Sequence, residues 1–419
     1  MTTVVQNYSP TTSNPPALPW LTTHLVPARF NAPGASAHNV VVLNLACNNA
    51  LTAGRGWEVE LPNGVYDVDH LGWQINTGPV RVYGQGYDET QPNDLHWFGT
   101  CISVPANQGG TALRVHGVGA RGFRLAGIAF RQEVTVPTSG EWRPAFTDKE
   151  FAVVIENLYG GFHVEDIFFP SALKGLTVRG TGSGTIGRAR ISSIKGDCIH
   201  RLLEMDRVLD ASSIGVIHSW PFSGPVPSIW TEAQGALYTP VMLGRVDGLH
   251  IGRLFTFNAV VGLHCKDFGS GVPRFVHVDS LYADFAGVGL YADGNNKLPG
   301  GDLVVTVDAM TFQGENFQLG GGVQRADAIP VVLRNNAFVV VNSLHAERFP
   351  THVVVIDQGT ANLRLGVLRT QLAGSGNTVT DITAGSVVRL GQSPEILSNH
   401  VNWRAGGTGT VTLPVVVSV

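Results

Sequence analysis

One short pattern recurs nine times between residues 125 and 368 of this 419-residue sequence. Each copy has an apolar residue, two small or polar residues, a second apolar residue and then alternating apolar and polar positions, as in VDSLYADF at 278–285. The most regular copies are 27 to 29 residues apart, and similarity at a nearly fixed period is typical of a solenoid. The apolar pairs are Leu125/Ile128, Val164/Ile167, Ile191/Ile194, Ile214/Ile217, Ile251/Leu254, Val278/Leu281, Val307/Met310, Val341/Leu344 and Leu365/Leu368.

The residues that flank each pair indicate which kind of solenoid this is. They alternate with period two, as in RFVHV at 274–278, whereas a helical repeat would show apolar spacings of three and four. Strict alternation would place the two residues of a pair on opposite faces, because they are three positions apart. A two-residue corner between two strands restores the inward phase. We therefore predict an all-β fold, a parallel β-helix with one repeat per turn. A β-sandwich with accidental similarity is the alternative.

Composition supports short strands over long helices. The sequence has 51 Gly, 14% charged residues and many Val, Ile and Thr, a profile that favours strands separated by turns. No apolar run reaches the roughly 18 residues of a membrane span, and a net charge of −4 gives no sign of nucleic-acid binding. The cysteines Cys47, Cys101, Cys198 and Cys265 lie far apart, so we expect reduced core residues without a disulfide framework.

The start of the chain differs from the rest. MTTVVQNYSPTTSNPPALPWL is rich in Pro, Thr, Ser and Asn and cannot form a core by itself. It lacks the basic and apolar regions of a secretory signal, so we expect synthesis in a cytoplasm. Residues 36–51 can form an amphipathic helix with Ser36 as N-cap, although the run of valines in this segment would also suit a strand. The predicted organisation is an extended arm at 1–34, an N-terminal cap with the first turns at 35–110, the β-helix body at 111–390 and a C-terminal strand region with oligomer contacts at 391–419.

The order of segments near the N-terminus resembles that of a known superfamily. A short helix is followed by LPNGVYDVD at 61–69, VRVYGQG at 80–86 and TALRVHGVGARGFRLAGIAF at 111–130. This order is similar to the start of pectate-lyase-like right-handed parallel β-helix proteins, in which the helix plugs the end of the solenoid. Polysaccharide lyases, hydrolases, epimerases and bacteriophage tailspikes share that fold. With its Pro-rich arm and no signal sequence, the chain looks most like a tailspike.

The tailspike resemblance implies partners and a location. Proteins of that kind are homotrimers that act within a virion, made in the cytoplasm of the host cell. They contact other virion or tail proteins through an N-terminal segment and bind bacterial surface polysaccharide. We carry these properties forward as expectations from the resemblance, together with the expectation that the chain does not insert into membranes.

The register of a β-helix also predicts an outward surface. When both residues of a pair point inward, the positions one and three after the second residue point outward, and turns stack about 4.8 Å apart. The first column contains Ala129, Phe168, Lys195, His218, Phe255, Tyr282, Thr311, His345 and Arg369. The second contains Arg131, Pro170, Asp197, Trp220, Phe257, Asp284, Gln313, Glu347 and Gln371. Such a stripe can bind sugars; alternatively, a loop or a neighbouring chain covers its aromatic members.

Two carboxylates of the second column suggest chemistry. Asp284 and Glu347 are two turns apart, so their backbones should be separated by about 9.6 Å. Their side chains can then approach the spacing of about 6.5 to 9.5 Å that inverting glycoside hydrolases use. These two residues are the catalytic candidates. The substrate-binding candidates beside them are Tyr282, Gln313, His345 and Phe257.

An insertion at 218–236, HSWPFSGPVPSIWTEAQGA, adds further binding candidates. It contains Trp220, Trp230, Glu232 and three prolines, which stiffen a loop. Aromatic residues on a stiff loop beside a groove suit ligand contact. The alternative is that the two tryptophans form the small core of the loop itself.

Two competing functions remain open. A purely structural or adhesive virion spike would use the stripe as an interface, without chemistry. A free polysaccharide lyase or epimerase would need a base, for which Lys195 beside Asp197 is the candidate, and a group that stabilises an enolate. No set of aspartates resembling a calcium site is evident on neighbouring turns. The segment GSGTIG at 182–187 matches a glycine-rich phosphate-binding motif, but a strand follows it, whereas a phosphate site of this kind needs a helix at that point. We therefore expect neither a metal nor a cofactor.

Overall fold

The computed structural model describes most of the chain as two compact units. Residues 57–412 are described, apart from 62, 69–71, 77, 88, 90–98, 105–109, 135, 138–139, 223–227, 296–302, 317–324, 350–351, 372–377, 383–385, 391–401 and 408–409. Unit 1 lies within Met1–Leu203 and Pro221–Ile229, and unit 2 within Glu204–Trp220 and Trp230–Val419. The arm predicted at 1–34 and the helix predicted at 36–51 fall outside the described residues.

Unit 1 consists of short strands followed by long bent ones. Parallel pairing carries one interior position from turn to turn: Val59 pairs with Val82, Val82 with Leu125 and Leu125 with Val164. All four side chains are buried. The elements are β1 (Trp57–Glu60), β2 (Gly64–Asp67), β3 (Trp73–Ile75), β4 (Val80–Tyr83), β5 (Thr100–Val104), β6 (Leu113–His116), the 3-10 helix η1 (Val118–Ala120), β7 (Arg124–Gln132), β8 (Val153–Glu156), β9 (Phe162–Arg179), β10 (Ile186–Gly187) and most of β11 (Ala189–Asp206).

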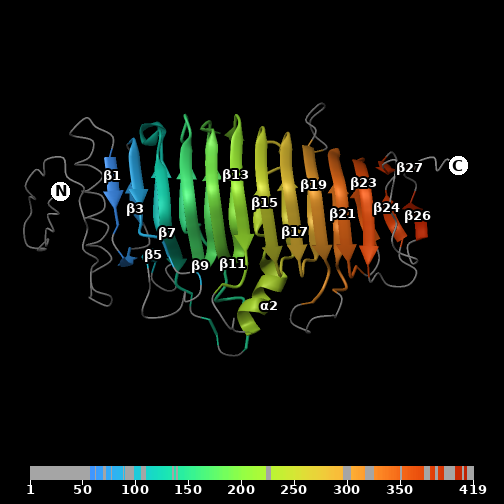
Figure 1. The fold of residues 1–419 in the computed structure, drawn as a ribbon, viewed down its shortest axis with the longest axis horizontal. Coiled ribbons are helices and arrows are strands. Elements are labelled where there is room, and N and C mark those ends of the chain that lie inside the picture. The colour runs from blue at the N-terminus through green and yellow to red at the C-terminus, as the bar shows by residue number, and fades with distance from the viewer. Residues whose placement is uncertain are drawn as a thin grey trace, which may run out of the picture. The chain divides into compact units, whose positions relative to one another are not determined.

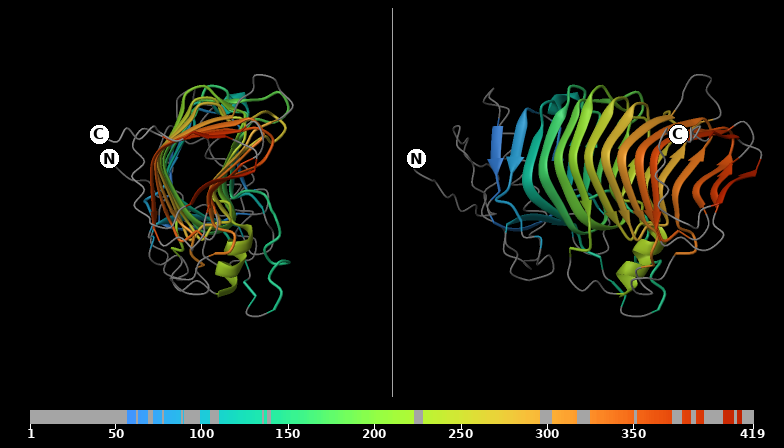
Figure 2. Two further views of the ribbon diagram at one scale, coloured as in Figure 1. Left: turned by 90° about the vertical axis from the view of Figure 1, so that its right-hand side faces the viewer. Right: turned by 45° about the vertical axis from the view of Figure 1, so that its right-hand side comes forward.

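Unit 2 is built from two stacks of parallel strands (Figure 1; Figure 2). One stack contains β13 (Ser212–Ser219), β15 (Leu249–Phe257), β17 (Val276–Asp284), β19 (Leu303–Gln313), β21 (Ala337–Glu347), β23 (Asn362–Gln371), β25 (Val387–Leu390) and β27 (Thr410–Thr412). The other contains β14 (Val241–Leu243), β16 (Val261–Lys266), β18 (Val288–Asp293), β20 (Ile329–Arg334), β22 (His352–Gln358), β24 (Thr378–Ile382) and β26 (Asn402–Gly407). The short β12 (Val208–Leu209) precedes them.

The repeated apolar pairs form the interior of the fold, as predicted. All eighteen residues of the nine pairs are at most 2% exposed. In unit 2 the pairs stack in register, with Val278 opposite Val307 and Leu281 opposite Met310. Between Val278 and Leu281 both residues of the corner face outward, which resets the side-chain phase as the sequence indicated. The chain is therefore an all-β parallel β-helix protein.

Large and small side chains alternate along the interior of unit 2. Phe312 pairs with Ala283 on one side and with Ala346 on the other, and all three are fully buried. The ring also lies against two glycines: a Cβ added at Gly289 would be 2.9 Å from Phe312 Cδ2, and one added at Gly314 would be 3.1 Å from Cε1. Phe312 thus fills a space that its small neighbours leave open.

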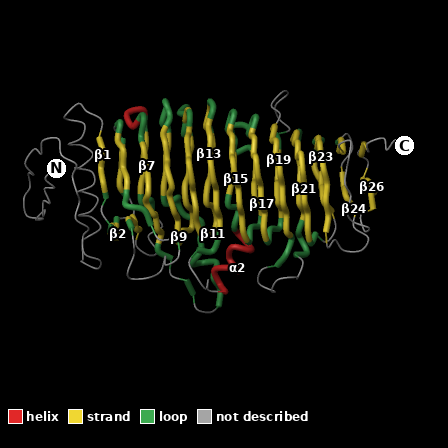
Figure 3. Tube along the Cα trace, viewed as in Figure 1, coloured by secondary structure: helices red, strands yellow, loops and turns green. Residues whose placement is uncertain are grey.

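Two further predictions can be compared with the described residues. Cys101, Cys198 and Cys265 are buried and free, as expected, whereas Cys47 lies outside the described residues. The insertion at 218–236 was predicted as a loop, but part of it forms the helix α2 (Ser228–Leu237) (Figure 3). Its second half has the good helix formers Glu, Ala, Gln and Leu. No helix among the described residues combines the length and apolar character needed to cross a bilayer.

Candidate functional site

The two carboxylates singled out in the sequence come to one edge of unit 2. Asp284 ends β17 and Glu347 ends β21. Gln313 ends β19 between them and pairs with Glu347, while the N–H of Ala286 donates to the carbonyl of Gln313 at 3.1 Å. Because parallel strands end at a common edge, these three side chains belong to one region of the surface.

A third carboxylate, Glu315, belongs to the same region. It follows β19, is 8% exposed and lies 2.5 Å from Nε of Arg348 through Oε1. Its charge raises the pKa of Asp284. The chain reaches this position through Gly314, where an added Cβ would lie 2.4 Å from the carbonyl oxygen of Arg348. Glu315 was missed in the sequence because it follows the turn after β19, where the outward columns no longer apply.

Asp284 is the most perturbed carboxyl group of this cluster. Burial, followed by the charge of Glu315, raises its pKa from 3.8 to about 6; Glu347 adds to the increase, and the N–H of Phe285 opposes it. The side chain is 9% exposed, and its buried Oδ1 has no hydrogen-bond partner among the described residues. A carboxyl group with such a pKa can hold a proton near neutral pH and donate it to a reacting oxygen.

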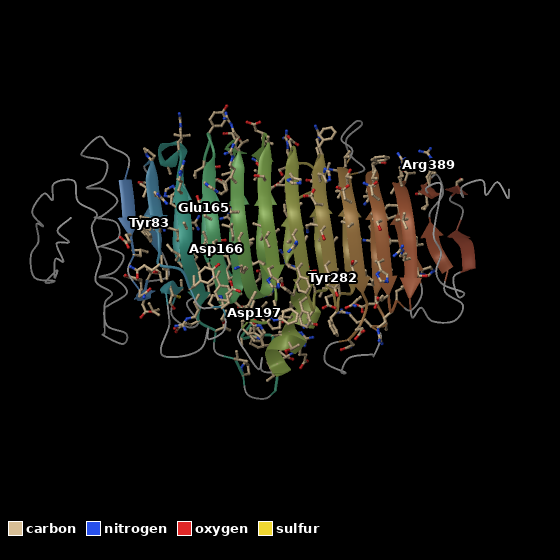
Figure 4. All side chains as sticks on the ribbon, in the orientation of Figure 1. Tyr83, Glu165, Asp166, Asp197, Tyr282 and Arg389 are labelled. Atoms are coloured by element: carbon tan, nitrogen blue, oxygen red, sulfur yellow. The ribbon has the colours of Figure 1, made fainter. Side chains whose placement is uncertain are left out.

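Glu347 is oriented by two polar neighbours. Nε2 of Gln313 donates to its Oε2 at 3.4 Å, and Nε2 of His345 lies 3.3 Å from its Oε1. Glu347 itself retains 18% side-chain exposure, so water can reach it. Tyr282 lies near the carboxyl end of β17 (Figure 4). Its pKa is raised by burial first and then by the charges of the three carboxylates.

Aromatic rings lie on the preceding strands of the same stack, β13 and β15, and at Tyr282 on β17 itself. The Phe255 ring meets the Tyr282 ring at 5.1 Å and the His218 ring at 5.2 Å, both nearly perpendicular. Trp220 packs on Phe257 at 4.7 Å between ring centroids and remains 40% exposed. Exposed aromatic faces next to carboxylates provide both kinds of group that contact a sugar, an apolar face and a hydrogen-bond acceptor.

Two predicted ligand contacts are buried in the structure. Phe257 is 5% exposed, because Trp220 and Phe285 cover it at ring distances of 4.7 and 5.1 Å. Trp230, on α2, is 4% exposed, whereas Trp220 of the same insertion is 40% exposed, so the two tryptophans do not form one buried core. Glu232, on the other side of that helix, is exposed. Phe257 and Trp230 therefore offer almost no ring surface to solvent in this structure.

In unit 1 the outward stripe is covered. Phe168 and Ala129 were predicted to face outward, but both are fully buried. Tyr87, from the segment between β4 and β5, stacks on Phe168 at 5.0 Å, and Phe222 meets it edge-on at 5.2 Å. Covering by loops was the alternative to a groove, and it holds for this part of the chain.

The residues proposed for a lyase are not arranged for that role. Asp197 is 1% exposed instead of outward-facing. Nζ of Lys195 lies 2.5 Å from Glu89 and 3.6 Å from Asp166. Burial lowers the pKa of Lys195, but the hydrogen bond to Glu89 and the charges of Asp166 and Glu89 outweigh it and raise the pKa above its usual value. A lysine held protonated is a poor general base.

Comparisons with known proteins leave the family open. No family model matches the sequence, and no curated protein matches it. Among solved structures, the chain is similar to a mutant DFA-IIIase from Arthrobacter chlorophenolicus A6 in complex with DFA-III, at 13% sequence identity and a TM-score of 0.47. The match covers 89% of this chain and 81% of that chain. A similarity this distant carries no conclusion about activity.

The raised pKa of Asp284 predicts a pH-dependent stability. Its folded pKa exceeds the unfolded value, so the folded state binds the proton more tightly. The contribution is fully present below pH 3.8 and is lost as the pH rises through about 6. Relative to Asp284→Asn, the wild-type protein should lose up to about 3 kcal/mol of unfolding free energy between pH 4 and 7.5. Urea denaturation of both proteins measures this difference, and a constant difference would contradict the perturbed ionisation.

Proposed function

We propose that this chain binds a polysaccharide along the aromatic and carboxylate surface of unit 2 and hydrolyses it with inversion. The observation that supports this most is the state of Asp284. It is a buried carboxyl group with a pKa of about 6 and an unpartnered oxygen, next to other carboxylates. A pair of carboxyl groups with different proton affinities is what glycoside hydrolysis requires.

The roles of the two carboxyl groups follow from their surroundings. Protonated Asp284 donates its proton to the oxygen of the scissile glycosidic bond as the carbon–oxygen bond breaks. Glu347 accepts a proton from a water molecule, which attacks the anomeric carbon from the opposite face. The two strands are two turns apart, about 9.6 Å between backbones, which leaves room for this water in an inverting reaction. Glu315 acts through Asp284 by raising its affinity for the proton.

Binding of the polymer is assigned to the groups around the carboxylates. Trp220 and Phe255 offer ring faces to the C–H faces of sugars, and Tyr282, Gln313 and His345 offer polar atoms to the hydroxyl groups. Glu232 on α2 is an exposed acceptor for further sugar units. The expected ligand is therefore a chain of several sugar units.

We also propose the biological setting that the tailspike resemblance implies. The polymer would be a capsule or lipopolysaccharide of a bacterial surface, and the protein a homotrimeric virion spike attached through its N-terminal arm. Light scattering after size exclusion tests the trimer, for which the expected mass is about three times the 44.6 kDa of the chain. A monomer mass would remove the trimeric arrangement and leave the hydrolase proposal untouched.

A polymer digestion experiment tests the proposed activity. The protein is incubated with purified capsules and lipopolysaccharides from a panel of bacteria, and products are separated by size. Oligosaccharides with saturated ends and an inverted anomeric configuration at the new reducing end, read by proton NMR, are expected for one polymer. Unsaturated products would instead indicate a lyase. The absence of products from a polymer that the protein binds would exclude hydrolysis of that polymer.

A non-enzymatic adhesive spike is the second candidate. The exposed Trp220 and the half-buried Phe255 and Tyr282 favour it, because such an aromatic surface binds sugars without any chemistry. In that case the wild-type protein and Asp284→Asn would bind the same polymer equally well, and neither would release products.

A further inference from the structure

A second group of polar side chains lies at the corner, or just before it, on three consecutive turns of unit 2. It comprises His250 on β15, His277 and Asp279 on β17, and Asp308 on β19. Parallel pairing places His250 beside His277, and the pairing of Val278 with Val307 places Asp279 beside Asp308. The four side chains are 44 to 51% exposed. The sequence interpretation missed this group because it examined the columns after each apolar pair, and not the residues just before the pair and in the corner within it.

The nitrogen and oxygen atoms of this group converge on a small volume. Nε2 of His277 lies 2.9 Å from Oδ2 of Asp308 and 3.6 Å from Oδ1 of Asp279. Ligand atoms of these three residues all lie within 4.8 Å of one another. Nε2 of His250 lies 2.7 Å from Oδ1 of Asp279, and Nδ2 of Asn342 donates to Oδ1 of Asp308 at 2.8 Å. Each carboxylate is therefore oriented by a further side chain.

From this geometry we infer that His277, Asp279 and Asp308 bind a divalent transition metal ion of the zinc class. Zinc takes histidine nitrogen and carboxylate oxygen at about 2.0 to 2.2 Å, so two ligands of a tetrahedral ion are about 3.3 to 3.6 Å apart. The separations of 2.9 Å (His277 to Asp308) and 3.6 Å (His277 to Asp279) lie on either side of that range. Calcium takes six to eight oxygen ligands, which two carboxylates and an imidazole do not supply.

The side chains that contact the proposed ligands are of the types that hold ligands in known metal centres. Ligating carboxylates are usually held by hydrogen bonds from a second layer of side chains. Asn342 holds Asp308 in this way, and His250 holds Asp279. The fourth coordination position would be open to solvent, because the three side chains are 44 to 48% exposed.

The bound ion would connect β17 and β19 and stabilise unit 2 by mass action. His277 and Asp284 are seven residues apart on β17, so this site is separate from the proposed hydrolytic site and does not depend on it. The competing explanation is that protonated histidines only form ion pairs with the aspartates. A zinc ion and a proton compete for the same nitrogen lone pair of His277, so zinc affinity should fall in acid.

Zinc titration of the full chain tests the inference. After treatment with EDTA and its removal, calorimetric titration with zinc chloride at pH 7.5 should give one site per chain, with a higher unfolding temperature that EDTA reverses. His277→Gln and Asp279→Asn should each abolish this site. Asn342→Ala should weaken binding by about 10-fold or more. Since these residues are exposed, circular dichroism should show unchanged folding.

His163→Gln is the matched control. His163 is also a surface histidine on a strand, 3.0 Å from one carboxylate, Glu165, and 3.1 Å from Ser192. It has no second carboxylate among the partners that the structure shows, so this variant should bind zinc like the wild type. The inference is overturned if zinc does not bind up to millimolar concentration, or if His277→Gln and Asp279→Asn bind it unchanged.

Discussion

Asp284→Asn is expected to reduce the rate of polysaccharide cleavage by at least about 100-fold, the usual minimum contribution of a general acid. Asparagine keeps the size of the side chain and cannot transfer the proton to the leaving oxygen. The buried position and the raised pKa of Asp284 are the reasons for proposing it as the acid. The rate is measured as release of reducing ends from a polymer that the wild-type protein cleaves, and binding of the same polymer is measured by calorimetry.

Asp293→Asn is the matched control for this prediction. Asp293 also ends a strand of unit 2, β18, but its Oδ1 accepts from Nδ2 of Asn335 at 2.8 Å. Its substitution should leave the cleavage rate within about 2-fold of wild type, because nothing assigns it to the reaction. Equal activity of Asp284→Asn and wild type would eliminate Asp284 as the acid. A loss of binding together with activity would instead assign Asp284 to recognition.

Phe312→Ala is expected to lower the unfolding free energy by about 3 to 5 kcal/mol, as large-to-small changes at buried aromatic positions do. Phe312 is fully buried and pairs with Ala283 and Ala346 on the adjacent turns. These small residues cannot extend into the space that the ring leaves, so a cavity remains. Chemical denaturation followed by circular dichroism measures the loss.

Phe338→Ala is the control for Phe312→Ala. It also removes a phenylalanine ring, but from an exposed position, so it shows how much of the loss in stability is due to burial. Phe338 lies on the neighbouring strand β21 but is 38% exposed. Its substitution should cost about 1 kcal/mol or less, since most surface changes have small effects. Similar losses for the two variants would contradict the interior position of Phe312.

The fold could be predicted because one physical rule determines which side chains face the interior in every turn of the β-helix. Val278 and Leu281 must both reach the interior, and only a corner between them allows this for strand residues. The same rule placed Asp284 and Glu347 at the ends of strands of one stack. The tailspike resemblance and the domain boundaries are not tested by the structure, and the arm and capping helix lie outside the described residues.

The site could be predicted only in part. The strand register determines which residues lie in an outward-facing column, but it does not determine which loops cover that column. Phe168 obeys the register and is nevertheless buried, because Tyr87 and Phe222 come from segments whose paths no repeat defines. Glu315 follows the turn at Gly314, outside any column. Proton affinities were equally inaccessible, since the pKa of Asp284 depends on burial and on Glu315, which only the three-dimensional structure brings together.

The pH dependence of polymer cleavage by the wild-type protein tests the central claim most directly. If protonated Asp284 is the acid, kcat/KM should fall as the pH rises through about 6, by about 10-fold for each further pH unit. The reason is that only the protonated form can donate. A rate that stays constant or rises between pH 6 and 8 would contradict the assignment of Asp284 as the proton donor.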